Sequence, residues 1–207
     1  TAFAKGRLPT HSENILGHPQ EPISLIILAK DDTTFLEAFS KAEWYLADQP
    51  GIGTMSRAAF AVWFSEEYDT APITPAFWNG QPHDFGFQAE TVDRSLRQRH
   101  HARFWSTGFR TADGQLVFVG TASFDDSLKW GLTHHIDPNI DAERDFLATG
   151  LRNTGLIRSE KRIQLVRPVL GQNLTGDPFF TDGKAVLLQL KSKTNAVTVK
   201  PESMLPQ

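Results

Sequence analysis

The residue pair Asp113-Gly114 constrains this 207-residue chain more than any other feature, because it lies between two apolar segments. Asp-Gly is a preferred pair for tight β-hairpin turns, since glycine adopts positive φ angles at little cost. Residues 98–109 precede the pair, and residues 116–124 follow it with apolar side chains on both faces. The sequence therefore predicts two antiparallel strands that are joined near Asp113-Gly114.

Other segments show the periods of strands and helices. The aliphatic run at residues 23–29 predicts a strand buried on both faces, and residues 84–88, 162–170 and 185–191 predict further strands. We expect a first helix that is capped by Asp32 or Thr33 and a second that opens at Thr54 and runs to about Tyr68. A third helix is expected at Asp137-Pro138, where aspartate caps the helix and proline takes the first helical position.

These elements predict an α+β fold with a single domain. We expect a mostly antiparallel sheet of five or six strands with about three helices. The domain is expected to span residues 23–191. It would follow an N-terminal linker over residues 1–22 and precede a polar tail over residues 192–207.

Composition excludes several classes of protein and site. The chain is 40% hydrophobic and 22% charged, which is typical of soluble globular proteins. The net charge of −3 argues against a nucleic-acid-binding protein. The absence of cysteine from the sequence excludes zinc–thiolate sites and cysteine nucleophiles. The longest apolar run is far shorter than the roughly 20 residues of a membrane helix. Because the chain starts at Thr1 without a methionine, we expect a fragment whose targeting information lies upstream.

Four of the seven histidines occur in two adjacent pairs, His100-His101 and His134-His135. Neighbouring residues of a strand point to opposite faces. We therefore expect His100 to be hydrogen-bonded on the core side, together with residues 102 and 104. His101 is expected to face outward or into a cleft.

Imidazole and carboxylate groups from these segments suggest a divalent-metal site. His101, His134, His135 and Asp137 are candidate ligands for zinc, iron or manganese. A structural interpretation is also open, because Asp137 has a sufficient role as a helix cap. The acids Asp141, Glu143 and Asp145 would stabilise the first helical turns. One of these three could otherwise serve as a catalytic base.

A basic segment accompanies the first histidine pair and contains Arg94, Arg97, Arg99, His101 and Arg103. Arg99 and Arg103 are candidate ligand-binding residues, because guanidinium groups match phosphate oxygens in a bidentate geometry. Two alternatives remain open at this point. The segment could be a solvated sheet face, or it could pair with the acids of residues 137–145 in a buried network that fixes the fold.

Two motifs carry a resemblance to a known family. They are R-H-H-x-R-x-W at residues 99–105 and T-H-H-I-D-P-x-x-D-A-E-R-D at residues 133–145. Together with the strand at 23–29 and the segments 84–88 and 113–120, they occur in the same order as in that family. On these residues the chain resembles the LssY C-terminal domain family over about residues 22–170. One departure is Glu43 before Trp44, where the family commonly has glycine.

The resemblance implies a bacterial protein of the cell envelope. The family is associated with a type I secretion locus, and its members often follow DedA-like or type-2 phosphatidic acid phosphatase-like membrane domains. It implies a soluble accessory domain with an interaction or regulatory role, whose partner is an upstream membrane domain or a membrane protein. Phe77, Trp78 and Trp130 are the candidate binding surface.

The alternative is an enzyme, and the sequence leaves that question open. A divalent-metal-dependent hydrolase would act on a phosphate-bearing or envelope-derived substrate through the His/Asp cluster. The metal would lower the pKa of a bound water to produce a nucleophile.

Overall fold

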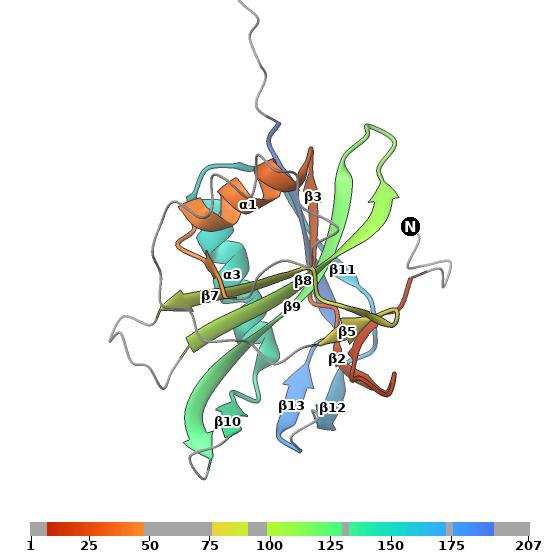
Figure 1. Ribbon diagram of the computed structural model, residues 1–207, viewed down its shortest axis with the longest axis vertical. Coiled ribbons are helices and arrows are strands. Elements are labelled where there is room, and N and C mark those ends of the chain that lie inside the picture. Colours follow the sequence, from red (N-terminus) through yellow and green to blue (C-terminus); the bar gives the residue numbers. More distant parts are fainter. Residues whose placement is uncertain (1–7, 48–75, 91–98, 130–132, 173–175, 193–207) are drawn as a thin grey trace, which may run out of the picture.

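The computed structural model describes residues 8–47, 76–90, 99–129, 133–172 and 176–192, and it shows a mostly β protein (Figure 1). Its two described helices are α1 (Asp32–Lys41) and α3 (Ile140–Asn153). Its strands are β1 (His11–Glu13), β2 (Pro19–Pro22), β3 (Leu25–Ala29), β4 (Tyr45–Leu46), β5 (Phe77–Trp78), β6 (Gln81–Pro82), β7 (Phe85–Glu90), β8 (Arg99–Arg110), β9 (Leu116–Lys129), β10 (Thr133–Ile136), β11 (Ile157–Gln164), β12 (Val169–Gln172), β13 (Pro178–Thr181) and β14 (Lys184–Leu190).

One eight-stranded sheet organises the protein. Its strand order is β11-β14-β3-β9-β8-β7-β4, and β10 pairs with the far end of β9. Strand β14 runs parallel to β3, and the other neighbours are antiparallel. Two small sheets, β2-β1-β5-β6 and β12-β13, lie beside it.

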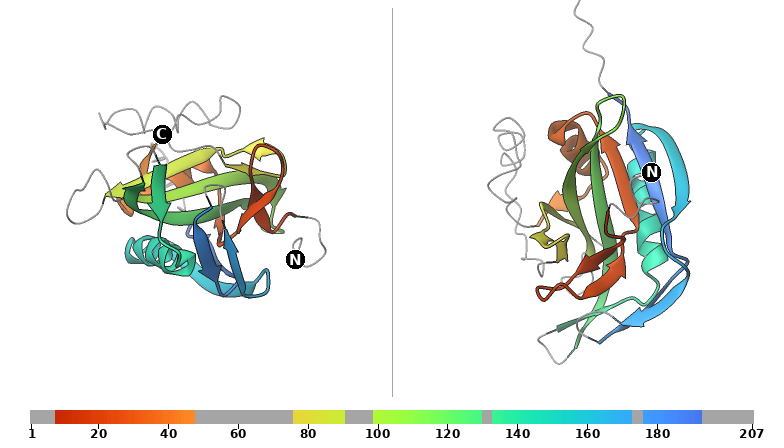
Figure 2. Two further views of the ribbon diagram at one scale, coloured as in Figure 1. Left: turned by 90° about the horizontal axis from the view of Figure 1, so that it is seen from below. Right: turned by 90° about the vertical axis from the view of Figure 1, so that its right-hand side faces the viewer.

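Helices α1 and α3 cover one face of the large sheet, which we call the inner face (Figure 2). The Phe35 ring of α1 stacks on Phe118 of β9 with centroids 4.1 Å apart, and Phe39 stacks on Phe87 of β7 at the same distance. The opposite, outer face carries a smaller apolar cluster that contains Trp78 and other residues from β3, β8 and β9. The large sheet is therefore covered on both sides over much of its area.

The predicted β-hairpin is confirmed as strands β8 and β9. Gly114 has φ +81°, and its amide donates to the carbonyl of Thr111 at 2.9 Å. Further along β9, a Cβ built on Gly120 would lie 2.5 Å from two ring carbons of Phe104. Glycine at this position lets the Phe104 ring lie flat against the neighbouring strand.

The predicted α+β class, with five or six strands and about three helices, is wrong. The largest sheet alone has eight strands, and residues 11–13 and 19–22 of the expected N-terminal linker form β1 and β2. Strand β2 contains Pro19 and Pro22 and lies at the edge of its sheet, where proline is tolerated, so its loop-like sequence still pairs. The expected strand at 162–170 is instead the end of β11 and the start of β12. The helix predicted at 54–68 lies outside the described residues.

Both described helices are capped by other residues than predicted. Asp31, not Asp32 or Thr33, caps α1 and accepts hydrogen bonds from the Thr34 amide and hydroxyl. Asn139, not Asp137, caps α3. Neither helix is long and apolar enough to cross a membrane, a finding that covers only the described part of the chain.

Candidate functional site

Strand β8 divides its motif between the two faces of the sheet. Ala102 and Phe104 lie in the inner core, and Trp105 lies in the outer apolar cluster. Because side chains alternate along a strand, His100 shares the inner face and His101 the outer face. The expected orientation of His100 is confirmed by its bond to a helix on the inner face.

His100 forms a hydrogen-bonded pair with a glutamate of α3. Its Nδ1 atom lies 2.9 Å from Oε1 and 3.0 Å from Oε2 of Glu143, whose exposed fraction is only 5%. The imidazole stacks on Phe146 with centroids 4.1 Å apart, and it contacts Phe124 on its other flank at 4.8 Å. The His100–Glu143 contact therefore connects β8 to α3 next to the aromatic rings of Phe124 and Phe146.

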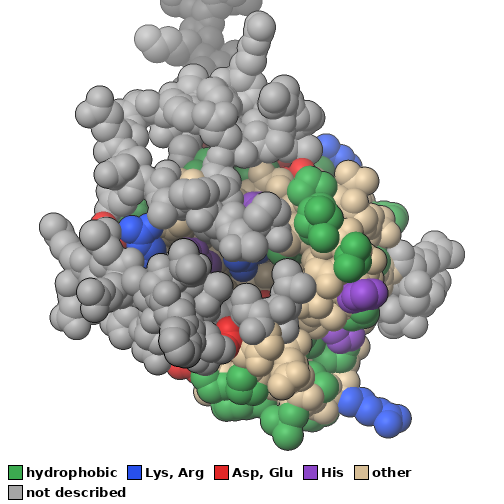
Figure 3. Space-filling view, turned by 60° about the horizontal axis from the view of Figure 1, so that its bottom comes forward, with side chains coloured by type: hydrophobic (Ala, Val, Ile, Leu, Met, Phe, Trp, Pro, Cys, Tyr) green, Lys and Arg blue, Asp and Glu red, His purple; other side chains and the backbone are tan. Residues whose placement is uncertain are grey.

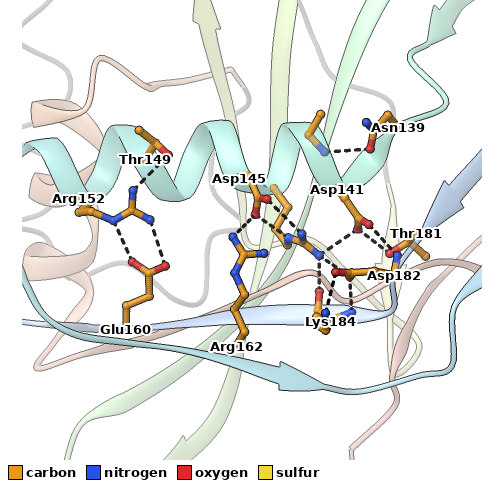
Figure 4. Close-up of polar contacts among 12 residues, drawn as sticks. Asn139, Asp141, Asp145, Thr149, Arg152, Glu160, Arg162, Thr181, Asp182 and Lys184 are labelled. Atoms are coloured by element: carbon orange, nitrogen blue, oxygen red, sulfur yellow. Dashed lines mark hydrogen bonds and ion pairs between the residues drawn. The ribbon is translucent and has the colours of Figure 1, made fainter.

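Arg144 is the second charged residue that α3 buries, with a 2% exposed fraction. Figure 4 shows Asp141 and Asp145 on the helix, with Thr181 and Asp182 beside Asp141. Its Nη1 atom donates to Asp141 at 2.9 Å, to Asp182 at 2.8 Å and to the carbonyl of Lys184 at 2.8 Å. Its Nε atom donates to Asp145 at 2.9 Å. One guanidinium therefore connects the first turns of α3 to the β13–β14 turn.

Asp141 completes this network from the helix side. Its Oδ1 atom accepts from the Thr181 hydroxyl and its Oδ2 atom accepts from the Asp182 amide, both at 2.6 Å. We call Asp141, Arg144, Asp145, Thr181 and Asp182 the α3 clamp. It fixes β13 onto the start of the helix.

The α3 clamp shifts the pKa values of its members. Burial raises the pKa of Asp145, but the hydrogen bonds and charges of Arg144 and Arg162 outweigh burial, and the pKa lies below its ordinary value of 3.8. Burial also raises the pKa of Asp182, and bonds from Lys184 and Arg144 bring it below the ordinary value. Both carboxyl groups are therefore held in the charged form.

The predicted metal ligands are only partly placed by the structure. Strand β10 contains His134 and His135, whose backbones pair with Leu128 and Ser127 of β9, but their side chains lie outside the described residues. Asp137 accepts from the Asn139 amide at 2.7 Å, which is a local turn contact. In the described part of the chain, no three His, Asp or Glu side chains are grouped so that they could hold a metal. Metal binding by these residues stays a prediction.

The outer face of β7, β8 and β9 brings Arg99, His101 and Arg103 together with other polar side chains. Cross-strand register places His101 between Gln88 and Ser123, and Arg103 between Gly86 and Thr121. We call this the outer polar face; its described members are Gln88, Glu90, Arg99, His101, Arg103, Thr121 and Ser123. Figure 3 shows Lys or Arg side chains near His side chains around the middle of that view. The other predicted basic residues, Arg94 and Arg97, lie outside the described part.

Several members of the outer polar face are buried. The exposed fractions are 7% for Gln88, 7% for His101, 3% for Thr121 and 2% for Ser123. Arg99 is half-buried, and its Nη1 atom donates to Oε1 of Gln88 at 2.9 Å. The alternation of side chains along β8 is enough to predict from the sequence that Arg99, His101 and Arg103 share one face. The residues that β7 and β9 add to this face follow only from the strand register.

The exposed apolar surface of the β12-β13 sheet was not predicted from the sequence. Leu170 is 84% exposed and lies directly opposite Phe180, which is 42% exposed. Figure 3 shows hydrophobic side chains gathered at the lower edge of that view. On the other side of this sheet, Phe179 is buried against Gly171.

The aromatic surface predicted from the sequence is not formed as expected. Trp78 is only 4% exposed, and its Nε1 atom donates to the carbonyl of Pro9 at 3.1 Å. Phe77 is half-buried, and Trp130 lies outside the described residues. Trp78 is an anchor for the N-terminal segment, because an indole with its N–H satisfied is well suited to burial.

Comparison with known proteins gives one match. The family model described as LssY C-terminus matches residues 5–185 of the chain. No curated protein and no solved structure matches it.

Proposed function

This chain belongs to the LssY C-terminal family, and we propose that it serves as an accessory interaction domain of a bacterial membrane-associated protein. The exposed face of the β12-β13 sheet is the surface through which it binds. The observation that supports this role is the contrast between the two sides of that small sheet: one side is firmly anchored, and the other presents Leu170 and Phe180 to solvent.

The anchoring involves several independent contacts. The Phe180 amide donates to the carbonyl of Pro138 at 2.8 Å, directly before α3. The next residue, Thr181, bonds to Asp141 in the α3 clamp. A rigid apolar surface loses little conformational entropy on binding, which is the advantage of a pre-organised interface. Removing charged groups such as Arg144 from water costs free energy. That the protein does so at this point indicates that the position of the β12-β13 hairpin is important for its function.

The charged residues of 137–145 support a structural rather than a catalytic role for that motif. Glu143 binds His100, Arg144 binds Asp141 and Asp145, and Asp137 binds a backbone amide. Each of these side chains helps to position α3, and this structural role is sufficient to explain its presence. The candidates for a general base named from the sequence are thus engaged in the fold.

The partner we propose is a membrane protein, either part of the same polypeptide or a separate chain of the cell envelope. The described surface around Leu170 and Phe180 is apolar, and aromatic and aliphatic anchors at the centre of an interface dominate its binding energy. We expect the partner to offer a matching apolar recess.

Binding to membrane vesicles of the host bacterium tests this function. The purified chain should bind untreated vesicles saturably, and mild proteolysis of the vesicles should remove the binding. Leu170→Glu should weaken binding at least tenfold. Ser40→Glu is the matched control, because Ser40 is exposed on α1, far from the β12-β13 sheet, and the variant gains the same charge without losing an apolar contact. Equal binding by the Leu170→Glu variant and the wild type would rule out this surface.

A further inference from the structure

The outer polar face is unusual for a sheet face that is largely covered. The inner face of the same three strands carries Phe85, Phe87, Phe104 and Phe118, all fully buried. The outer face instead keeps a glutamine, a histidine and two hydroxyl groups below 10% exposure. Burying polar groups is unfavourable unless they have partners, and Gln88, His101 and Arg103 each take part in an interaction. The row is therefore held in position by contacts within the protein.

The register aligns these groups across neighbouring strands. Opposing residues of antiparallel strands have Cβ atoms about 5 Å apart, and alternate residues of one strand are about 7 Å apart. His101 thus has Arg103 beside it along β8 and Ser123 beside it on β9. Thr121 lies opposite Arg103 on β9. A guanidinium, an imidazole and two hydroxyl groups therefore extend from neighbouring positions, close enough for their side chains to reach the same tetrahedral anion.

Register places Arg103 in the middle of this group, between Gly86 of β7 and Thr121 of β9 and two residues from His101. Arg99 lies at the other end of the row, opposite Glu90. Gln88 accepts from Arg99 and fixes the orientation of that guanidinium.

We propose that the outer polar face binds the phosphate group of an anionic ligand, with Arg103 and His101 as the main contacts and Arg99 as a second cation. A guanidinium binds two phosphate oxygens at once, and the Thr121 and Ser123 hydroxyls are suited to the remaining oxygens. The phosphate group is the recognised chemistry. It is present both in free inorganic phosphate and in phosphomonoesters, and the experiment separates these two sources.

Isothermal titration of the purified chain with inorganic phosphate and with methyl phosphate tests the site. We expect saturable one-to-one binding of at least one of them, and no comparable binding of acetate. Tighter binding of methyl phosphate identifies a phosphomonoester ligand, and tighter binding of inorganic phosphate identifies the free ion. Arg103→Gln should weaken binding at least tenfold, and Arg103→Lys should weaken it less, because lysine keeps the charge but loses the bidentate geometry.

Arg110→Gln is the matched control. Arg110 ends the same strand, is exposed, and donates to the carbonyl of Gly114 at 2.8 Å. This variant should bind phosphate like the wild type, and so should Leu170→Glu, which separates this site from the interaction surface. Thermal unfolding of every variant identifies any loss that comes from misfolding; if Arg103→Gln does not fold, the Arg103→Lys comparison decides. Absence of saturable phosphate binding by the folded wild type, or equal binding by the folded Arg103 variants, would overturn the proposal.

Discussion

Replacing Arg144 with methionine should destabilise the protein strongly, because it removes the cation of the α3 clamp and keeps only the apolar stem. The guanidinium donates to three carboxylates and one carbonyl within 3.3 Å. Removing one partner of a buried ion pair costs about 3–5 kcal/mol. Asp145 and Asp182 are 42% and 36% exposed and can be solvated, so we expect the lower end, about 3 kcal/mol.

A loss of this size is a large fraction of the roughly 5–15 kcal/mol that stabilises a typical protein. In a chain of this length it corresponds to a fall in Tm of about 6–12 °C. Arg144→Lys should fall between the wild type and Arg144→Met, since lysine restores the charge but not the planar fork. Urea unfolding and scanning calorimetry measure both variants.

The control for this prediction is Arg152→Met on the same helix. Arg152 pairs with Glu160 at 3.0 Å but is 46% exposed, and such surface pairs contribute only about 0–1 kcal/mol. Hydrogen exchange gives a local readout: the Phe180 and Asp182 amides should exchange faster in Arg144→Met. If Arg144→Met loses no more stability than Arg152→Met, the clamp is not a stabilising element and the reasoning from burial is refuted.

Two further predictions concern pH and packing. Because the pKa of Asp145 is lower in the folded state, its charge stabilises the fold above the ordinary value of 3.8, and this contribution disappears as the pH falls through the lowered pKa. Asp145→Asn should therefore show a smaller drop in Tm than the wild type between pH 5 and pH 2; an identical drop would argue against the shift. Gly120→Ala should cost about 1–3 kcal/mol in urea unfolding, because the new Cβ overlaps the Phe104 ring. Gly150→Ala on α3, where the nearest atom is 3.7 Å away, should instead stabilise by about 0.5–1 kcal/mol, and a loss of stability there would contradict the helical propensity argument.

Strand periodicity and turn chemistry predicted the centre of the fold from the sequence. The Asp113-Gly114 turn, the strands around it and the opposite orientations of His100 and His101 depend on neighbouring residues alone, so local patterns were sufficient. The helix caps were missed by one or two positions. Several adjacent residues can accept the same backbone hydrogen bond, and Asp31 is as capable of it as Asp32.

The α3 clamp could not be predicted in the same way, because its partners are far apart in the sequence. Arg144 and Asp182 are separated by 38 positions, and their contact depends on the path of β13. One local signal was present: Glu143 and Arg144 occupy the apolar stripe of α3 with Ile140 and Leu147, so their positions indicated buried charges. The network considered from the sequence joined the basic segment of residues 94–103 to the acids of residues 137–145. The described contacts are different: Glu143 bonds to His100, and Asp141 and Asp145 bond to Arg144 of the same helix.

Metal content of the untagged, purified chain tests most directly whether this is an interaction domain whose acidic motif builds the fold. We expect well below one equivalent of zinc, iron or manganese per chain by elemental analysis. His101→Ala and His135→Ala should leave that content unchanged. A near-stoichiometric metal in the wild type that is lost in both variants would contradict the proposed function, and would favour a metal-dependent hydrolase.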